Sequence, residues 1–115
     1  MLILSKAALR YAVDVCLEKK SHVIIVAKYS YDVRQISSEL EDIIFDTEER
    51  PYKNSQATCI RYYYKNHSTI VIATVTENFR GRRANTVIVQ KEIFDTPNVN
   101  KIFLQIETLD RYEMQ

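Results

Sequence analysis

The chain has 115 residues, a net charge of +1 and a hydrophobic fraction of 46%, as expected for one small globular domain. This balance gives no overall attraction to nucleic acid or acidic membranes, and no apolar run approaches the ~20 residues that cross a bilayer. Cys16 and Cys59 lie in apolar patterns without the Cys/His spacing of a zinc site. We therefore expect a single domain over residues 1–115, cytoplasmic, without membrane contact and without a bound metal.

The first half of the chain predicts a helix, a strand and a second helix. Residues 2–19 repeat apolar side chains at four-residue spacing, which is typical of a helix. Residues 22–28 are an apolar, β-branched run, which is typical of a strand buried on both faces of a parallel sheet. Residues 31–45 again show helical spacing, with Ser30 as the expected N-cap, and a polar loop follows over residues 46–56.

The second half of the chain predicts strands. Residues 57–64 and 69–75 form a hairpin around the polar turn 65–68. Residues 86–89 and 101–107 predict two further strands, and residues 109–115 a frayed tail or short terminal turn. Together these elements predict an α/β fold whose mostly parallel sheet carries an antiparallel hairpin.

Gly81 is the only glycine of the chain, although glycine averages about 7% of protein residues. Loops that cradle phosphate need glycines so that backbone N–H groups can approach the ligand. Neither G-x-x-x-x-G-K-[ST] nor G-x-G-x-x-G can be written with a single glycine. These 115 residues therefore contain neither of the two standard phosphate loops.

Several segments resemble, in order, the ATPase domain of the terminase large subunit, the DNA-packaging motor of phages and viruses. The turn Tyr64-Lys65-Asn66-His67-Ser68-Thr69 resembles that family's aromatic-x-Asn-Gly-Ser-Thr turn, with His67 in place of glycine. Arg80-Gly81-Arg82-Arg83-Ala84 and the strand 86–89 resemble its Arg-Gly-x-x-Ala loop and the strand that ends in Asp-Glu. The helix 2–17 and the strand and helix over 23–45 precede them in the family's order.

The resemblance covers residues 2–92, with residues 93–115 as a C-terminal strand and tail. It implies a partial, three-layer fold like that of P-loop NTPases, lacking the first strand and the phosphate loop, which would lie immediately before Leu2. Gln90 and Lys91 occupy the Asp-Glu positions and form a degenerate Walker B motif. Glutamine binds a hard cation poorly and lysine repels it, while Glu92 lies one residue too far along and on the other face.

We therefore expect no catalytic residue and no ATP hydrolysis by this chain alone. ATP and magnesium are expected only if another chain supplies the missing elements. Arg80, Gly81, Arg82 and Arg83 are candidates for contact with phosphate, nucleic acid or a neighbouring subunit, because the arginine fork suits phosphate. The alternative is a solvated turn that uses the backbone freedom of Gly81.

Two other groups of residues have an ordinary structural interpretation. The run Arg61-Tyr62-Tyr63-Tyr64-Lys65 has the composition of a stacking surface for nucleic-acid bases, but tyrosine is also a common strand residue, which we favour. His22 and His67 are far apart in sequence and predict no metal site.

Three functions remain as hypotheses. The first is a truncated, catalytically silent, terminase-like fragment that joins other packaging-motor subunits or DNA. The second is a small, non-enzymatic phage or viral protein that binds a host or viral partner, or itself, through an exposed sheet edge. The third is a nucleic-acid-binding module that uses the Arg80 loop.

Overall fold

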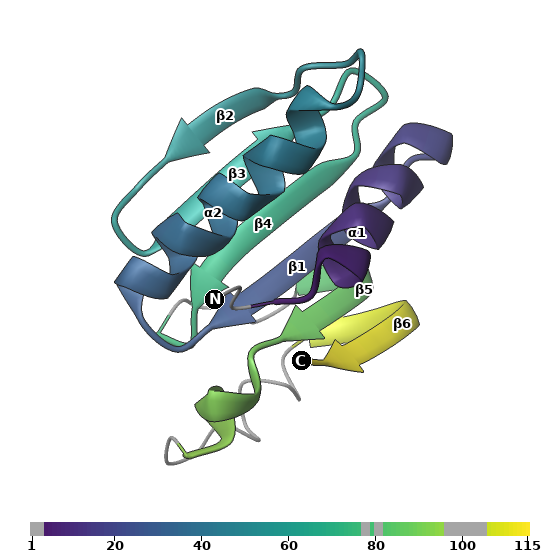
Figure 1. Cartoon of the computed structure of the whole chain (residues 1–115). Coiled ribbons are helices and arrows are strands. Elements are labelled where there is room, and N and C mark those ends of the chain that lie inside the picture. Colours follow the sequence, from purple (N-terminus) through teal and green to yellow (C-terminus); the bar gives the residue numbers. More distant parts are fainter. Residues whose placement is uncertain (1–3, 77–78, 80–81, 96–105) are drawn as a thin grey trace.

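The computed structural model describes residues 4–76, 79, 82–95 and 106–115, with the backbone alone described for Ile106–Met114. These described residues form two α-helices, six strands and one 3-10 helix (Figure 1). In order these are α1 (Lys6–Glu18), β1 (His22–Ala27), α2 (Ser30–Phe45), β2 (Tyr52–Ser55), β3 (Cys59–Tyr63), β4 (Thr69–Thr74), β5 (Arg82–Val89), η1 (Lys91–Asp95) and β6 (Ile106–Met114).

The six strands form one mixed sheet in the order β2-β3-β4-β1-β5-β6. β1 is parallel to both of its neighbours, β4 and β5, and β5 is parallel to β6. β3 is antiparallel to β2 and to β4. The predicted α/β class, with a mostly parallel sheet and an antiparallel hairpin, is therefore confirmed, and the predicted hairpin is β3–β4.

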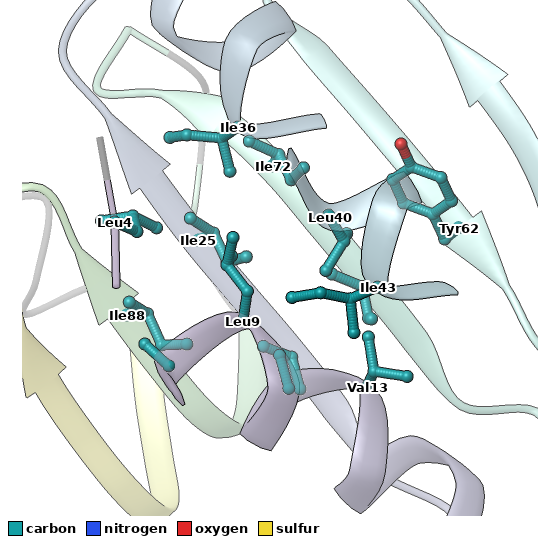
Figure 2. Packing of buried hydrophobic residues seen from close by; sticks show 14 of the residues in the cluster. Leu4, Leu9, Val13, Ile25, Ile36, Leu40, Ile43, Tyr62, Ile72 and Ile88 are labelled. Atoms are coloured by element: carbon teal, nitrogen blue, oxygen red, sulfur yellow. The ribbon is translucent and has the colours of Figure 1, made fainter. Parts of the chain in front are cut away.

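Both helices cover the same face of the sheet, as Figure 1 shows. Side chains of α1 and α2, including Leu9, Val13, Ile36 and Leu40, pack in one cluster with Ile25 and its neighbours on the sheet (Figure 2). On the opposite face a second cluster joins strand residues to Phe79 and Ile93, which belong to no described α-helix or strand.

The expected three-layer arrangement is therefore not met in the residues that the structure describes. The connection between β4 and β5 explains the difference. These strands flank β1 and run parallel to it, and only the seven residues 75–81 connect them, whereas a crossover that contains a helix needs a dozen or more residues. Val75 and Phe79, both buried in the second cluster, are the described apolar side chains of this connection that cover the face.

The helix boundaries differ from the prediction at their amino-terminal ends. α1 begins at Lys6 rather than at residue 2, because the Ser5 hydroxyl caps the helix by accepting a hydrogen bond of 3.1 Å from the N–H of Ala8. The expected N-cap Ser30 is instead the first residue of α2, and the capping position belongs to Tyr29, which makes no side-chain cap bond. Among the described residues, no helix is long and apolar enough to cross a membrane.

Two strands were missed in segments that look polar. The predicted loop 46–56 contains β2, and the predicted tail 109–115 is wrong, since most of it belongs to β6. The predicted strand 101–107 falls mostly outside the described residues, and only its last two positions lie in β6. β5 begins at Arg82 rather than at residue 86.

Candidate functional site

The candidate site is the edge of the sheet where the parallel strands end. The registers Ala27↔Thr74 and Val26↔Val89 show that β1, β4 and β5 end together at this edge. In open α/β sheets, ligands generally bind in the crevice outside the carboxyl ends of such strands. The residues that follow these strands, Lys28 after β1 and Gln90 after β5, therefore decide what chemistry the edge can offer.

Gln90 holds the ends of β1 and β5 together. Its side-chain Oε1 accepts a hydrogen bond of 2.9 Å from the backbone N–H of Lys28, and its own N–H donates to the carbonyl of Val26 at 2.9 Å. The residue is 8% exposed. The amide oxygen of Gln90 is thus already engaged within the fold, and this position offers no carboxylate for a cation.

The next residue, Lys91, ties this edge to the end of the described chain. Its N–H donates to the carbonyl of Gln115 at 2.7 Å, and the N–H of Gln115 donates to the carbonyl of Val89 at 2.8 Å. The Gln115 side chain in turn accepts from the N–H of Ser5, before α1, at 3.4 Å. The amino end of α1 and the end of β6 therefore meet at this edge, and the side chain of Lys91 is exposed.

An exposed aromatic pair that the sequence analysis missed lies beside Lys28. The rings of Tyr29 and Tyr31 stack at 5.1 Å with an interplanar angle of 15°, and Lys28 Nζ lies 5.3 Å from the Tyr29 ring. Both tyrosines are about half exposed or more. This arrangement can stack against a planar group, and its signal in the sequence was the Lys-Tyr-Ser-Tyr spacing directly after a buried strand.

The predicted arginine candidates do not share a site with Gln90 and Lys91. Arg82, half-buried, and Arg83, exposed, begin β5, whereas Gln90 follows its last residue. An eight-residue strand is about 23 Å long, so these two arginines and Gln90 lie at opposite edges of the sheet. Arg80 and Gly81 lie outside the described residues.

The tyrosine run of β3 packs as an ordinary strand. Tyr62 is buried beneath α2, where its hydroxyl contacts Ser37 and donates to Glu41 at 2.8 Å, and burial raises the pKa of Tyr62. Tyr64 is also buried, while Tyr63 points to the other face and is 41% exposed. The strand-packing interpretation is therefore confirmed for Tyr62 and Tyr64, and these three residues do not form a continuous surface for stacking bases.

The β3–β4 turn has a structural role. His67 adopts φ 71° and is the one non-glycine residue with positive φ in the described chain. It stands where the aromatic-x-Asn-Gly-Ser-Thr turn, which this segment resembles, has glycine. Asn66 Nδ2 donates to the carbonyl of Cys16 at 2.7 Å, and Ser68 Oγ lies 3.1 Å from the same carbonyl and 3.2 Å from that of Lys19. These side chains satisfy carbonyls that the end of α1 leaves unpaired.

Among the residues that the structure describes, no three His, Cys, Asp or Glu side chains lie together so that they could hold an ion. His22 Nδ1 lies 2.8 Å from Thr69 Oγ1, and burial, with the nearby charge of Lys20, lowers the pKa of His22.

The edge of the sheet at the carboxyl ends of the parallel strands offers the engaged amide of Gln90, two lysines and an aromatic pair. No protein-family model and no curated protein sequence matches the chain.

Proposed function

We propose that this chain is a catalytically silent, terminase-like α/β protein that acts by assembly rather than by hydrolysing ATP. In this role it contributes its sheet and the Arg80 loop to a complex with other subunits of a DNA-packaging motor. The resemblance of residues 2–92 motivates the choice of family, and the order of helices, hairpin and apolar strand is compatible with it.

The observation that carries the proposal is the hydrogen bond from Lys28 N–H to Gln90 Oε1. Motors of this type need a carboxylate at the end of this strand to hold magnesium, and the nucleotide phosphates need a glycine-rich loop. Here the side chain at that position joins β1 to β5, and the next residue is the exposed cation Lys91. An ammonium group at this edge repels a divalent cation instead of binding it.

The test is magnesium-dependent ATP turnover by the purified chain, measured as phosphate release. We expect no turnover above a protein-free blank, and none after Gln90→Asp and Lys91→Glu are introduced together, because the chain still has only one glycine. Gln90→Ala is the control for contaminating ATPases, because the activity of a contaminant does not change when Gln90 of this chain is replaced. Hydrolysis that EDTA abolishes and that Gln90→Ala alters would contradict the proposal.

A further inference from the structure

β2 is an edge strand with an open outer side. It is the terminal strand of the sheet and pairs with β3 alone among the described strands. All four of its residues, Tyr52–Ser55, are exposed. An open edge presents backbone donors and acceptors to which another extended chain can pair.

The hydrogen-bond alternation of β2 identifies which backbone groups are presented. The N–H of Gln56 donates to the carbonyl of Cys59 at 2.9 Å, so these two residues form a hydrogen-bonded pair at the β2–β3 turn. Hydrogen-bonded and non-hydrogen-bonded pairs alternate along an antiparallel ladder. The pairs Ser55↔Ile60 and Lys53↔Tyr62 are therefore non-hydrogen-bonded, and the N–H and C=O groups of Ser55 and Lys53 point outward, away from β3.

A groove of about 370 Å³ lies between β2 and α2, on the face of the sheet to which the side chains of Lys53 and Ser55 point. Lys53 and Ser55 form one wall, Ile60 contributes to the floor, and Arg34, Asp42 and Phe45 lie along the wall formed by α2. Lys53 Nζ reaches Glu41 across the groove at 2.7 Å. Glu41 is held in turn by the hydroxyls of Ser37 and Tyr62 at 2.9 and 2.8 Å, so the contact between the two walls is fixed by four side chains.

The charges along the α2 wall match the spacing of an extended chain. Arg34 and Asp42 are both exposed, and their eight-residue separation on a helix is about 12 Å. Side chains four residues apart on a strand point to the same face and are about 13 Å apart. α2 and β2 run in opposite directions (Figure 1). The first turns of α2, which contain Arg34, therefore lie beside the end of β2, and its last turn, which contains Phe45, lies beside the start of β2.

We propose that an extended segment of a partner protein adds to β2 as an antiparallel strand and places alternate side chains in this groove. Its residue i is acidic and faces Arg34, and residue i+2 is a small aliphatic side chain opposite Ser55. Residue i+4 lies opposite Lys53, whose ammonium is turned to Glu41 and paired with it at 2.7 Å, and is basic because it faces Asp42. The backbone groups of residues i+2 and i+4 bond to those of Ser55 and Lys53. This inference does not depend on the absence of ATP hydrolysis, and the two tests fail separately.

The test uses a labelled peptide, acetyl-Ser-Glu-Thr-Val-Thr-Lys-Ser-amide, titrated with the chain and followed by fluorescence anisotropy. We expect saturable binding that is lost when the valine or the lysine is N-methylated, because those N–H groups would bond to β2. N-methylation of either threonine is the matched control and leaves binding intact, since those N–H groups point to solvent. A peptide with the glutamate and lysine exchanged should bind about fivefold more weakly.

Two pairs of protein variants place the peptide on the molecule. Ser55→Pro removes an outward N–H without removing a bond to β3, and edge strands tolerate such a proline; it should abolish binding, whereas Ser55→Ala should not. Asp42→Lys should weaken binding about fivefold and recover it with a peptide that has glutamate in place of lysine. Asp46→Lys makes the same change in charge outside the groove and should have no effect.

Three results would overturn the inference. The first is the absence of saturable binding at millimolar protein, and the second is equal sensitivity to all N-methylations, which would show that no strand ladder forms. The third is concentration-dependent dimerisation that Ser55→Pro abolishes while the peptide fails to bind, which would make a second copy of the chain the occupant of β2. Circular dichroism of each variant establishes that it is folded before binding is measured.

Discussion

The hydroxyl group of Ser68, beside the β3–β4 turn, lies 3.1 Å from the backbone carbonyl of Cys16, near the end of α1, although the residues are 52 positions apart. The same hydroxyl accepts a hydrogen bond of 2.9 Å from the N–H of Ser21. Ser68 is fully buried. The polar residues of the β3–β4 turn therefore have a structural role, because their side chains cap the end of α1 and join it to the sheet.

Replacing Ser68 by alanine should destabilise the fold. The change removes the hydroxyl that pairs with the buried N–H of Ser21 and one of the two side-chain donors to the Cys16 carbonyl, which keeps Asn66. Leaving a buried backbone group without its partner typically costs about 1–3 kcal/mol. Urea denaturation measures the free energy of unfolding. Ser38→Ala on the exposed surface of α2 is the control, and its free energy of unfolding should stay within about 0.5 kcal/mol of that of the original chain. An equally small change in Ser68→Ala would show that the Ser68 hydroxyl does not stabilise the end of α1.

His67→Gly should stabilise the fold. A non-glycine residue in the left-handed region costs roughly 1–2 kcal/mol, and glycine removes that cost at the expense of a more flexible unfolded chain. We expect a net gain of about 1 kcal/mol in the free energy of unfolding, whereas His67→Ala should bring none. A loss of stability in His67→Gly would show that the imidazole makes a contact that outweighs the backbone strain.

Glu41 should make stability depend on acid. Burial alone would raise the pKa of Glu41, but hydrogen bonds from Lys53, Tyr62 and Ser37 hold it below its ordinary value of 4.5. The carboxylate therefore contributes stability above pH 4.5, and this contribution is lost as the pH falls through the lowered pKa of the folded protein. Glu41→Gln should be less stable than the original chain at neutral pH, and the two should converge in acid.

The measurement is the free energy of unfolding from neutral pH down to well below 4.5 for the original chain and for Glu41→Gln. Glu48→Gln, on an exposed side chain, is the matched control and should follow the original chain throughout. Parallel curves for the original chain and Glu41→Gln would show that the four-residue contact in the groove contributes nothing that depends on ionisation.

Cys16 should be unreactive in the folded protein. Burial raises the pKa of Cys16 from its ordinary value of 9.0 to about 12, which lowers its thiolate fraction at neutral pH about a thousandfold. In a Cys59→Ala variant, a disulfide reagent should label Cys16 only at the rate at which the protein opens, and rapidly in denaturant. Fast labelling in native buffer would mean that the end of α1 opens without global unfolding.

The strongly apolar parts of the fold could be predicted from the sequence, and the exposed strands could not. The strand His22–Ala27 could be predicted because a β-branched run is typical of a strand buried on both faces. β2 is exposed at every position, so no alternation of apolar and polar residues marks it. Its identity depends on pairing with β3, which is a tertiary fact, and the same holds for the predicted tail that pairs with β5 as β6.

The candidate site shows the same limit. The sequence alone predicts that Gln90 and Lys91 supply no carboxylate for a metal ion, because the type of side chain decides which ligand a position can offer. It could not show that Gln90 Oε1 accepts from the backbone N–H of Lys28, since every residue has a backbone N–H and only the register of β1 and β5 selects this one. The groove beside β2 was invisible for the same reason.

The capping of α1 by the β3–β4 turn also sets an order of events in folding. α1 lies at the beginning of the chain, but carbonyls at its end find their partners only in residues 66–68. The last turn of the helix therefore stays frayed during synthesis until the β3–β4 turn has been made. We expect pulsed hydrogen exchange during refolding to show protection of that turn together with the hairpin, and later than protection of the first turn, which Ser5 caps locally.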